Sequence, residues 1–168
     1  EEELKEYRTV TVAEYKESVA AAKKVADSDS ASEGEIREAY ENLKKAFEGL
    51  EKKMVYNAFT PGKTWQDTDG NKIQAHGGQV QKLTVLDKQT GEPVEKWWWV
   101  GEDKTKGYRG GICAYSSFDL YNWEFEGVVM RNVTSREELD TDEYFKELYA
   151  GYTKEQLDNV YRCINDST

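Results

Sequence analysis

The sequence has little of the chemistry that builds metal or disulfide sites. Cysteine occurs only at positions 113 and 163, and the one histidine is His76. Two cysteines do not make a disulfide framework, and with a single histidine they cannot supply an ordinary zinc site. Carboxylate-rich sites for calcium or magnesium stay open. Residues 67–71 (DTDGN) begin like a calcium loop but lack the later acidic ligand, so we interpret them as a turn and expect no cofactor.

The sequence also lacks a basic surplus and a long apolar run. Its net charge of −10 argues against nucleic acid and against an anionic membrane surface, because both need a basic partner. A neutral glycan is indifferent to this charge. No apolar run approaches the roughly 20 residues that cross a bilayer, and the acidic residues 1–3 are the opposite of a signal-peptide start. Localisation must be inferred from other features, since a processed or excised fragment would have lost its signal.

Residues 1–55 form the first predicted domain, a helical hairpin. Thr11–Glu14 and Ser32–Glu35 match the capping box that opens a helix. Apolar residues then recur at helical spacing, which predicts two antiparallel helices. Because two helices bury little surface alone, we expect Leu4 and Tyr7 to belong to the stub of a third. The two stripes are Val12, Tyr15, Val19, Ala22 and Val25, and Ile36, Ala39, Tyr40, Leu43, Phe47 and Leu50.

Residues 56–168 form the second predicted domain, where the pattern changes to short strands. We expect strands near 78–86, 96–101, 111–116 and 125–130, with a hairpin loop at 87–91 and a short helical turn at 118–122. Four sequential strands at this spacing predict an antiparallel meander, the unit of a propeller blade. Capping-box matches at 135–138 and 153–156 predict further helices at the end of the chain. The predicted fold class is therefore α+β.

The helical part resembles a known module. The stretch from Tyr15 through 39–43 (AYENL) to Leu50 is similar to the FIVAR module. Such modules are small helical units strung along secreted and cell-wall proteins of Gram-positive bacteria. The similarity covers about the last two helices of a module and implies a secreted or bacterial cell-surface location.

Three motifs in the second domain resemble glycoside hydrolase family 43, in its galactanase-like branch. They are residues 65–78 (WQDTDGNKIQAHGG), 97–102 (WWWVGE) and 113–123 (CAYSSFDLYNW). The family implies a five-bladed β-propeller that hydrolyses glycosidic bonds with inversion, and the branch acts on β-1,3-galactan. Five blades need more chain than follows residue 60, so we expect a partial propeller: one blade with a helical insertion, in a fragment of a larger secreted hydrolase. The alternative is a non-catalytic carbohydrate-binding or spacer module of a bacterial cell surface.

The resemblance implies sugar-binding residues but no catalytic pair. Most of family 43 carries its base in an alanine-aspartate-proline motif, where this chain has Ala75-His76-Gly77, and the acid is expected on a later blade. We therefore assign no catalytic residue. The predicted substrate-binding residues are His76, Gly77, Trp99, Glu102 and Tyr115, and the predicted partner is a galactose-containing oligo- or polysaccharide.

Two of these assignments stay open at the level of the sequence. Glu102 either binds sugar hydroxyls, because a carboxylate accepts two donors at once, or is a solvated carboxylate paired with Lys104. His76 is either a neutral hydrogen-bonding residue of a pocket or a structural histidine held by the backbone. The oligomeric state is not predicted.

Overall fold

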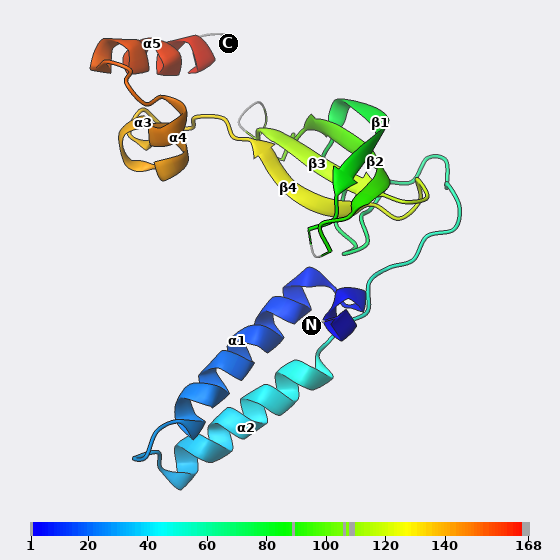
Figure 1. Cartoon of the computed structure of the whole chain (residues 1–168), viewed down its shortest axis with the longest axis vertical. Helices are drawn as coiled ribbons and strands as arrows, with labels where there is room; N and C mark the ends of the chain where they lie inside the picture. Colours follow the sequence, from blue (N-terminus) through cyan, green and yellow to red (C-terminus); the bar gives the residue numbers. More distant parts are fainter. Residues whose placement is uncertain (1, 89, 106, 108–109, 166–168) are drawn as a thin grey trace. The chain divides into compact units, whose positions relative to one another are not determined.

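The computed structural model describes residues 2–88, 90–105, 107 and 110–165 (Figure 1). Over these ranges the chain is α+β, with five α-helices and one four-stranded antiparallel sheet. It divides into two compact units. The first unit is Glu1–Ile73 with Asp119–Glu124, and the second is Gln74–Phe118 with Phe125–Thr168. The division into compact units does not test the predicted domain boundary, so the boundary after residue 55 stays a prediction.

The first unit begins with the predicted helical hairpin. The 3-10 helix η1 (Glu2–Glu6) precedes α1 (Thr9–Ala26) and α2 (Glu33–Glu48). The capping box of α2 is confirmed: Glu35 N donates to Ser32 Oγ at 3.3 Å, and Ser32 N donates to Glu35 Oε2 at 2.8 Å. The local sequence therefore sets where α2 begins.

The capping box expected at Thr11 is wrong. The helix α1 begins at Thr9, so Thr11 lies inside it and its hydroxyl donates to the carbonyl of Arg8 at 3.0 Å. The amide of Thr9 donates instead to Asp69 Oδ1, at 2.9 Å. A carboxylate at a helix N-terminus satisfies an unpaired amide and complements the helix dipole. The start of α1 is thus capped from the turn at 67–71.

The second unit contains the predicted meander. Its strands are β1 (His76–Leu86), β2 (Pro93–Glu102), β3 (Ile112–Ser117) and β4 (Glu124–Met130, whose first residue belongs to the first unit), in the order β1-β2-β3-β4. Trp99 is the register partner of Val80 and Tyr115, whereas Trp98 is the partner of Gln81 and Ser116. Since register partners share a face, Trp98 faces opposite to Trp97 and Trp99, as the alternation of strand residues predicts.

The connection from β3 to β4 differs from its expected form. Residues 118–122 form a series of bends and no helical turn. Leu120 takes a φ of 69°, which is the one positive value among non-glycine residues in the described ranges. Asp119 Oδ1 holds the bend by accepting hydrogen bonds from the amides of Tyr121 and Asn122, both at 2.8 Å.

Three short helices complete the second unit: α3 (Glu138–Thr141), α4 (Glu143–Leu148) and α5 (Lys154–Asn165). Val133, Leu139 and Phe145 form their buried centre. The partly buried residues around it are Tyr149, Leu157, Val160, Tyr161 and Ile164.

The predicted caps at the start of these helices have different outcomes. The box at Thr153 is present, because Gln156 N donates to Thr153 Oγ1 at 3.3 Å and Thr153 N donates to Gln156 Oε1 at 2.8 Å. At Ser135 only half of the box is present, because the amide of Glu138 donates to Ser135 Oγ at 3.4 Å. The Glu138 carboxylate instead accepts from the amide of Thr134, at 2.8 Å, and from its hydroxyl. These contacts hold the pKa of Glu138 below its usual value, the Thr134 side chain contributing most.

Candidate functional site

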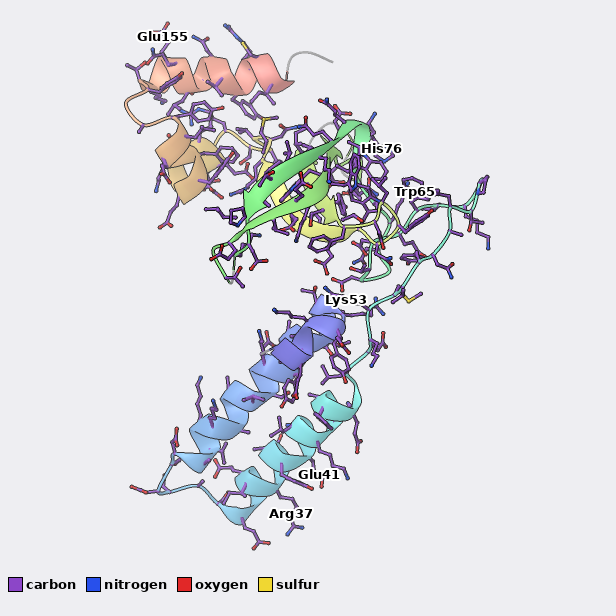
Figure 2. The ribbon with its side chains drawn as sticks, turned by 45° about the vertical axis from the view of Figure 1, so that its right-hand side comes forward. Arg37, Glu41, Lys53, Trp65, His76 and Glu155 are labelled. Carbon is purple, nitrogen blue, oxygen red and sulfur yellow. The ribbon has the colours of Figure 1, made fainter. Side chains whose placement is uncertain are left out.

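Three of the five predicted binding residues, His76, Gly77 and Glu102, lie where β1 begins and β2 ends, whereas Trp99 and Tyr115 are register partners whose side chains face the other side of the sheet from Glu102. His76 is the register partner of Glu102, and Trp99 is the partner of Tyr115. Gly77 follows His76 within an irregularity of the β1–β2 ladder between His76 and Gln79. Figure 2 marks His76 at the start of β1. We call these five residues, together with Gln74 and Lys104, the His76 cluster.

Tyr115 and Trp99 hold the backbone that leads into the cluster. The Tyr115 side chain is only 3% exposed, and its hydroxyl accepts a hydrogen bond from the amide of Gln74 at 3.0 Å. The indole Nε1 of Trp99 donates to the carbonyl of Ala75 at 3.1 Å. Both rings therefore hold the backbone that leads into β1, and Tyr115 also contacts Phe125, at a ring-centroid distance of 5.2 Å.

His76 is half-buried and bonded to a neighbouring amide side chain. Its Nε2 lies 3.2 Å from Gln74 Oε1, which also accepts a hydrogen bond from the amide of Lys104 at 3.4 Å. Because a carbonyl oxygen only accepts, Nε2 is the donor and carries a proton in this contact. Gln74, which was not among the predicted site residues, thus links the start of β1 to the loop after β2.

Glu102 and Lys104 are the exposed part of the cluster. Their charged groups lie 3.3 Å apart, and the two side chains are 60% and 56% exposed. The pairing that the sequence left open is therefore present. An exposed ion pair of this kind is worth only about 0–1 kcal/mol, so a ligand hydroxyl can replace Lys104 at the carboxylate at little cost.

Two glycines bring the backbones of the cluster together. A Cβ on Gly78 would lie 2.2 Å from the carbonyl oxygen of Val100, and a Cβ on Gly101 would lie 2.4 Å from the carbonyl carbon of Ala75. Real Cβ atoms do not approach backbone this closely, so both positions require glycine. Gly77 has a φ of 59° and open space around its Cα.

The chemistry available in the cluster is that of polar recognition. It offers a carboxylate as acceptor, an ammonium group as donor and an imidazole that serves either role. No group of three His, Cys, Asp or Glu side chains that could hold a metal ion occurs in the part of the chain that the structure describes. Asp103, beside Glu102, is engaged in its own turn, because its Oδ1 accepts from the amide and the hydroxyl of Thr105 at 2.8 and 2.6 Å.

A second concavity, which the sequence did not predict, lies within the first unit. Its volume is about 270 Å³. We call it the aromatic pocket. The signal in the sequence was weak, because its rings come from positions far apart in the chain. Its lining residues are Tyr56, Ala58, Phe59, Thr60, Lys63, Thr64, Trp65, Gln66, Leu120, Tyr121 and Trp123.

Comparisons with protein-family models, with curated proteins and with solved structures found no match to this chain. Over the described ranges, none of the helices combines the length and the apolar character needed to span a membrane.

Proposed function

We propose that this chain binds a neutral, galactose-containing glycan at the His76 cluster and serves as a blade of a secreted bacterial glycoside hydrolase of the family 43 type. The observation that carries the proposal is the pairing of His76 with Glu102 across β1 and β2, next to the backbone of residues 74–75 that Tyr115 and Trp99 hold. A sugar presents hydroxyl groups around an apolar ring face. An exposed carboxylate, an imidazole and an ammonium group match those hydroxyls.

The form of the sheet supports its assignment as a blade. A propeller blade is a four-stranded antiparallel meander, which is the order found here. Large apolar side chains on both outer strands are exposed, among them Val80 and Leu83 on β1 and Phe125 and Val129 on β4. Large apolar side chains of this kind are stabilised when another protein surface covers them. Neighbouring blades would supply that surface.

The proposed role is binding and does not include the complete hydrolytic reaction. Inversion needs an acid and a base far enough apart to admit a water molecule, about 6.5–9.5 Å. The segment that resembles the family's base motif carries His76 in place of a carboxylate. We therefore propose that this chain contributes the subsite that holds the sugar.

A titration with β-1,3-galactobiose, followed by ¹H–¹⁵N NMR, tests this role. We expect the amides of His76, Gly77 and Glu102 to shift, and Glu102→Gln to weaken binding by roughly tenfold. Removing one hydrogen bond to a charged group costs about 1.5–3 kcal/mol, and a factor of ten is about 1.4 kcal/mol.

Glu95→Gln is the matched control. Glu95 is a second carboxylate of β2 that pairs with one lysine, Lys82, at 2.7 Å. It lies outside the His76 cluster, so this variant should bind as tightly as the unmodified chain. Equal affinity in Glu102→Gln, or silence of the cluster amides in the unmodified chain, would contradict the proposal.

One observation favours a second role, that of a spacer. The hairpin buries only Thr11 in α1 and no residue in α2. A long helical pair with so little core resembles a connecting element more than a binding scaffold. A pure spacer predicts that no amide of the chain responds to a saccharide.

A further inference from the structure

The aromatic pocket is a well-defined concavity that has no part in the function proposed above. Its wall is made by residues 56–66 and by the β3–β4 connection, both within the first unit. Figure 2 labels Trp65 on the first of these segments. A volume of about 270 Å³ is just below the roughly 300–1,000 Å³ of pockets for drug-sized ligands. The space therefore suits a single ring.

Hydrogen bonds hold the two walls together. Asn122 clamps Tyr56 from both sides: its Oδ1 accepts from the amide at 2.7 Å, and its Nδ2 donates to the carbonyl at 2.9 Å. The Tyr56 hydroxyl donates to the carbonyl of Asp67 at 3.3 Å. The amide of Thr68 donates to the carbonyl of Trp123 at 2.9 Å. The pocket is thus fixed before any ligand arrives, which lowers the entropic cost of binding.

The one strained non-glycine residue of the described chain lies in this wall. Leu120 lines the pocket with a φ of 69°, and the indole Nε1 of Trp123 donates to its carbonyl at 3.0 Å. A positive φ in a branched residue persists only where the surroundings impose it, and such residues cluster at ligand sites. The strain supports a ligand site here, independently of the rings.

Three aromatic rings of the pocket contact one another and remain partly exposed. Phe59 lies between Trp65, with ring centroids 5.2 Å apart, and Tyr121, with centroids 4.6 Å apart. The exposed fractions of Phe59, Trp65 and Tyr121 are 49%, 41% and 36%. Aromatic faces are electron-rich and attract the polarised C–H groups of an apolar ring face. The exposed rings therefore form a platform for a flat, partly apolar ring.

Polar groups surround this platform. The side chains of Thr60, Lys63 and Thr64 line the pocket and are exposed. Gln66 lines it too, and its Nε2 is engaged with the carbonyl of Gly70 at 2.9 Å, which leaves the amide oxygen as an acceptor. Lys63 is the single charged residue of the lining. One cation in a chain of net charge −10 is a poor site for an anion, so the rim favours neutral hydroxyl groups.

We propose that the aromatic pocket is a second saccharide site, which holds one hexopyranose ring of a neutral oligosaccharide against Phe59, Trp65 and Tyr121. The saccharide class follows from the pocket itself: aromatic faces for the C–H face of the ring, and hydroxyl, amide and ammonium groups for its rim. The choice of galactose as the sugar rests on the function proposed above. An apolar peptide is the competing occupant, and the test includes it.

The test is the same NMR titration with β-1,3-galactobiose, read at different resonances. The amides of Phe59 and Tyr121 and the indole N–H of Trp65 report the pocket, whereas the amides of His76 and Glu102 report the other site. Shifts at the pocket with a silent His76 cluster would support this inference and contradict the function proposed above. Shifts at the His76 cluster with a silent pocket would overturn this inference alone, and silence at both sites would overturn both proposals.

Variants decide whether the rings bind the sugar. We expect Trp65→Ala to weaken binding at the pocket by roughly tenfold and to leave the response of His76 and Glu102 unchanged, whereas Trp65→Phe keeps part of the affinity. Unchanged resonances of Tyr56 and Asn122 show that the clamp still forms. Phe118→Ala removes an exposed ring outside the pocket and should have no effect.

Two further results would overturn the inference. One is equal affinity in Trp65→Ala and in the unmodified chain. The other is a response of the pocket to the apolar dipeptide Leu-Leu but not to galactobiose.

Discussion

The two helical regions of the molecule are built in opposite ways. The helices α1 and α2 have 18 and 16 residues, yet the only buried side chain that they contain is Thr11. The helices α3, α4 and α5 have 4, 6 and 12 residues, yet they enclose Leu139 and Phe145. Side chains are therefore buried where several helices pack around one point, whatever the length of those helices.

The apolar stripe of α2 shows the consequence for the hairpin. Ile36, Tyr40 and Phe47 follow helical spacing but are more than half exposed, because α1 is the one helix or strand of the described chain that packs closely against α2. Phe47 makes a ring contact with Tyr15, at 6.1 Å. In water, such a hairpin depends on local interactions, whereas α3–α5 depend on their shared core.

The largest expected effect is the difference between two Phe→Ala truncations, one in each region. Phe145→Ala empties a position that is 1% exposed and should lower the free energy of unfolding of the second unit by about 3–5 kcal/mol. Phe47→Ala changes a side chain that is 61% exposed and should cost less than about 1 kcal/mol. Urea unfolding, combined with hydrogen exchange at Leu139 and Lys44, measures both. Similar costs for the two variants would show that the regions do not differ in packing.

A smaller effect is expected from removing the matched helix caps. Ser32→Ala and Thr153→Ala each delete a hydroxyl that accepts from the first turn of α2 or α5, and such losses cost about 0.5–2 kcal/mol. We expect more fraying in α2, because α5 also packs against Val133, Leu139 and Phe145. Hydrogen exchange at the amides of Glu35 and Gln156 reports each cap. Faster exchange at Gln156 than at Glu35 would contradict the expectation that α2 frays more than α5.

The smallest effect is a difference in response to acid. The hydroxyl and then the amide of Ser32 lower the pKa of Glu35 from its usual 4.5. A carboxylate whose pKa is lower in the folded state stabilises that state above its unfolded pKa, and this stability is lost as the pH falls through the folded value. The cap of α2 should therefore weaken below about pH 4.5, whereas the cap of α5 uses Gln156, which does not ionise.

Amide exchange between pH 7 and pH 3, referred to intrinsic rates, measures this difference. Glu35→Gln is the control, because it keeps the geometry of the box and removes the titration. If α2 of that variant still frays selectively in acid, another group is responsible.

The sequence predicted those features that depend on neighbours within a few residues. The meander and the caps at Ser32 and Thr153 follow from local patterns, and the structure contains them. The start of α1 was misplaced because Asp69, 60 residues away, supplies its cap. A contact between residues this far apart in the chain leaves no local pattern in the sequence.

The His76 cluster and the aromatic pocket also differ in how far their residues could be predicted from the sequence. Five members of the His76 cluster came from motif resemblance, and the register pairs His76 with Glu102 and Trp99 with Tyr115. The role of Gln74 was missed because it depends on Lys104, 30 residues away. The aromatic pocket could not be predicted, since Tyr121 reaches Phe59 only after the β3–β4 connection has folded.

The close backbone approach at Gly78 and Gly101 has a consequence for protein engineering. Any side chain at either position would collide with Val100 or Ala75, so the cluster cannot be transplanted by copying its functional side chains alone. The smallest portable unit is residues 74–78 and 99–104 together with Tyr115, with both glycines included. A graft onto another sheet must therefore match main-chain spacing first and residue identity second.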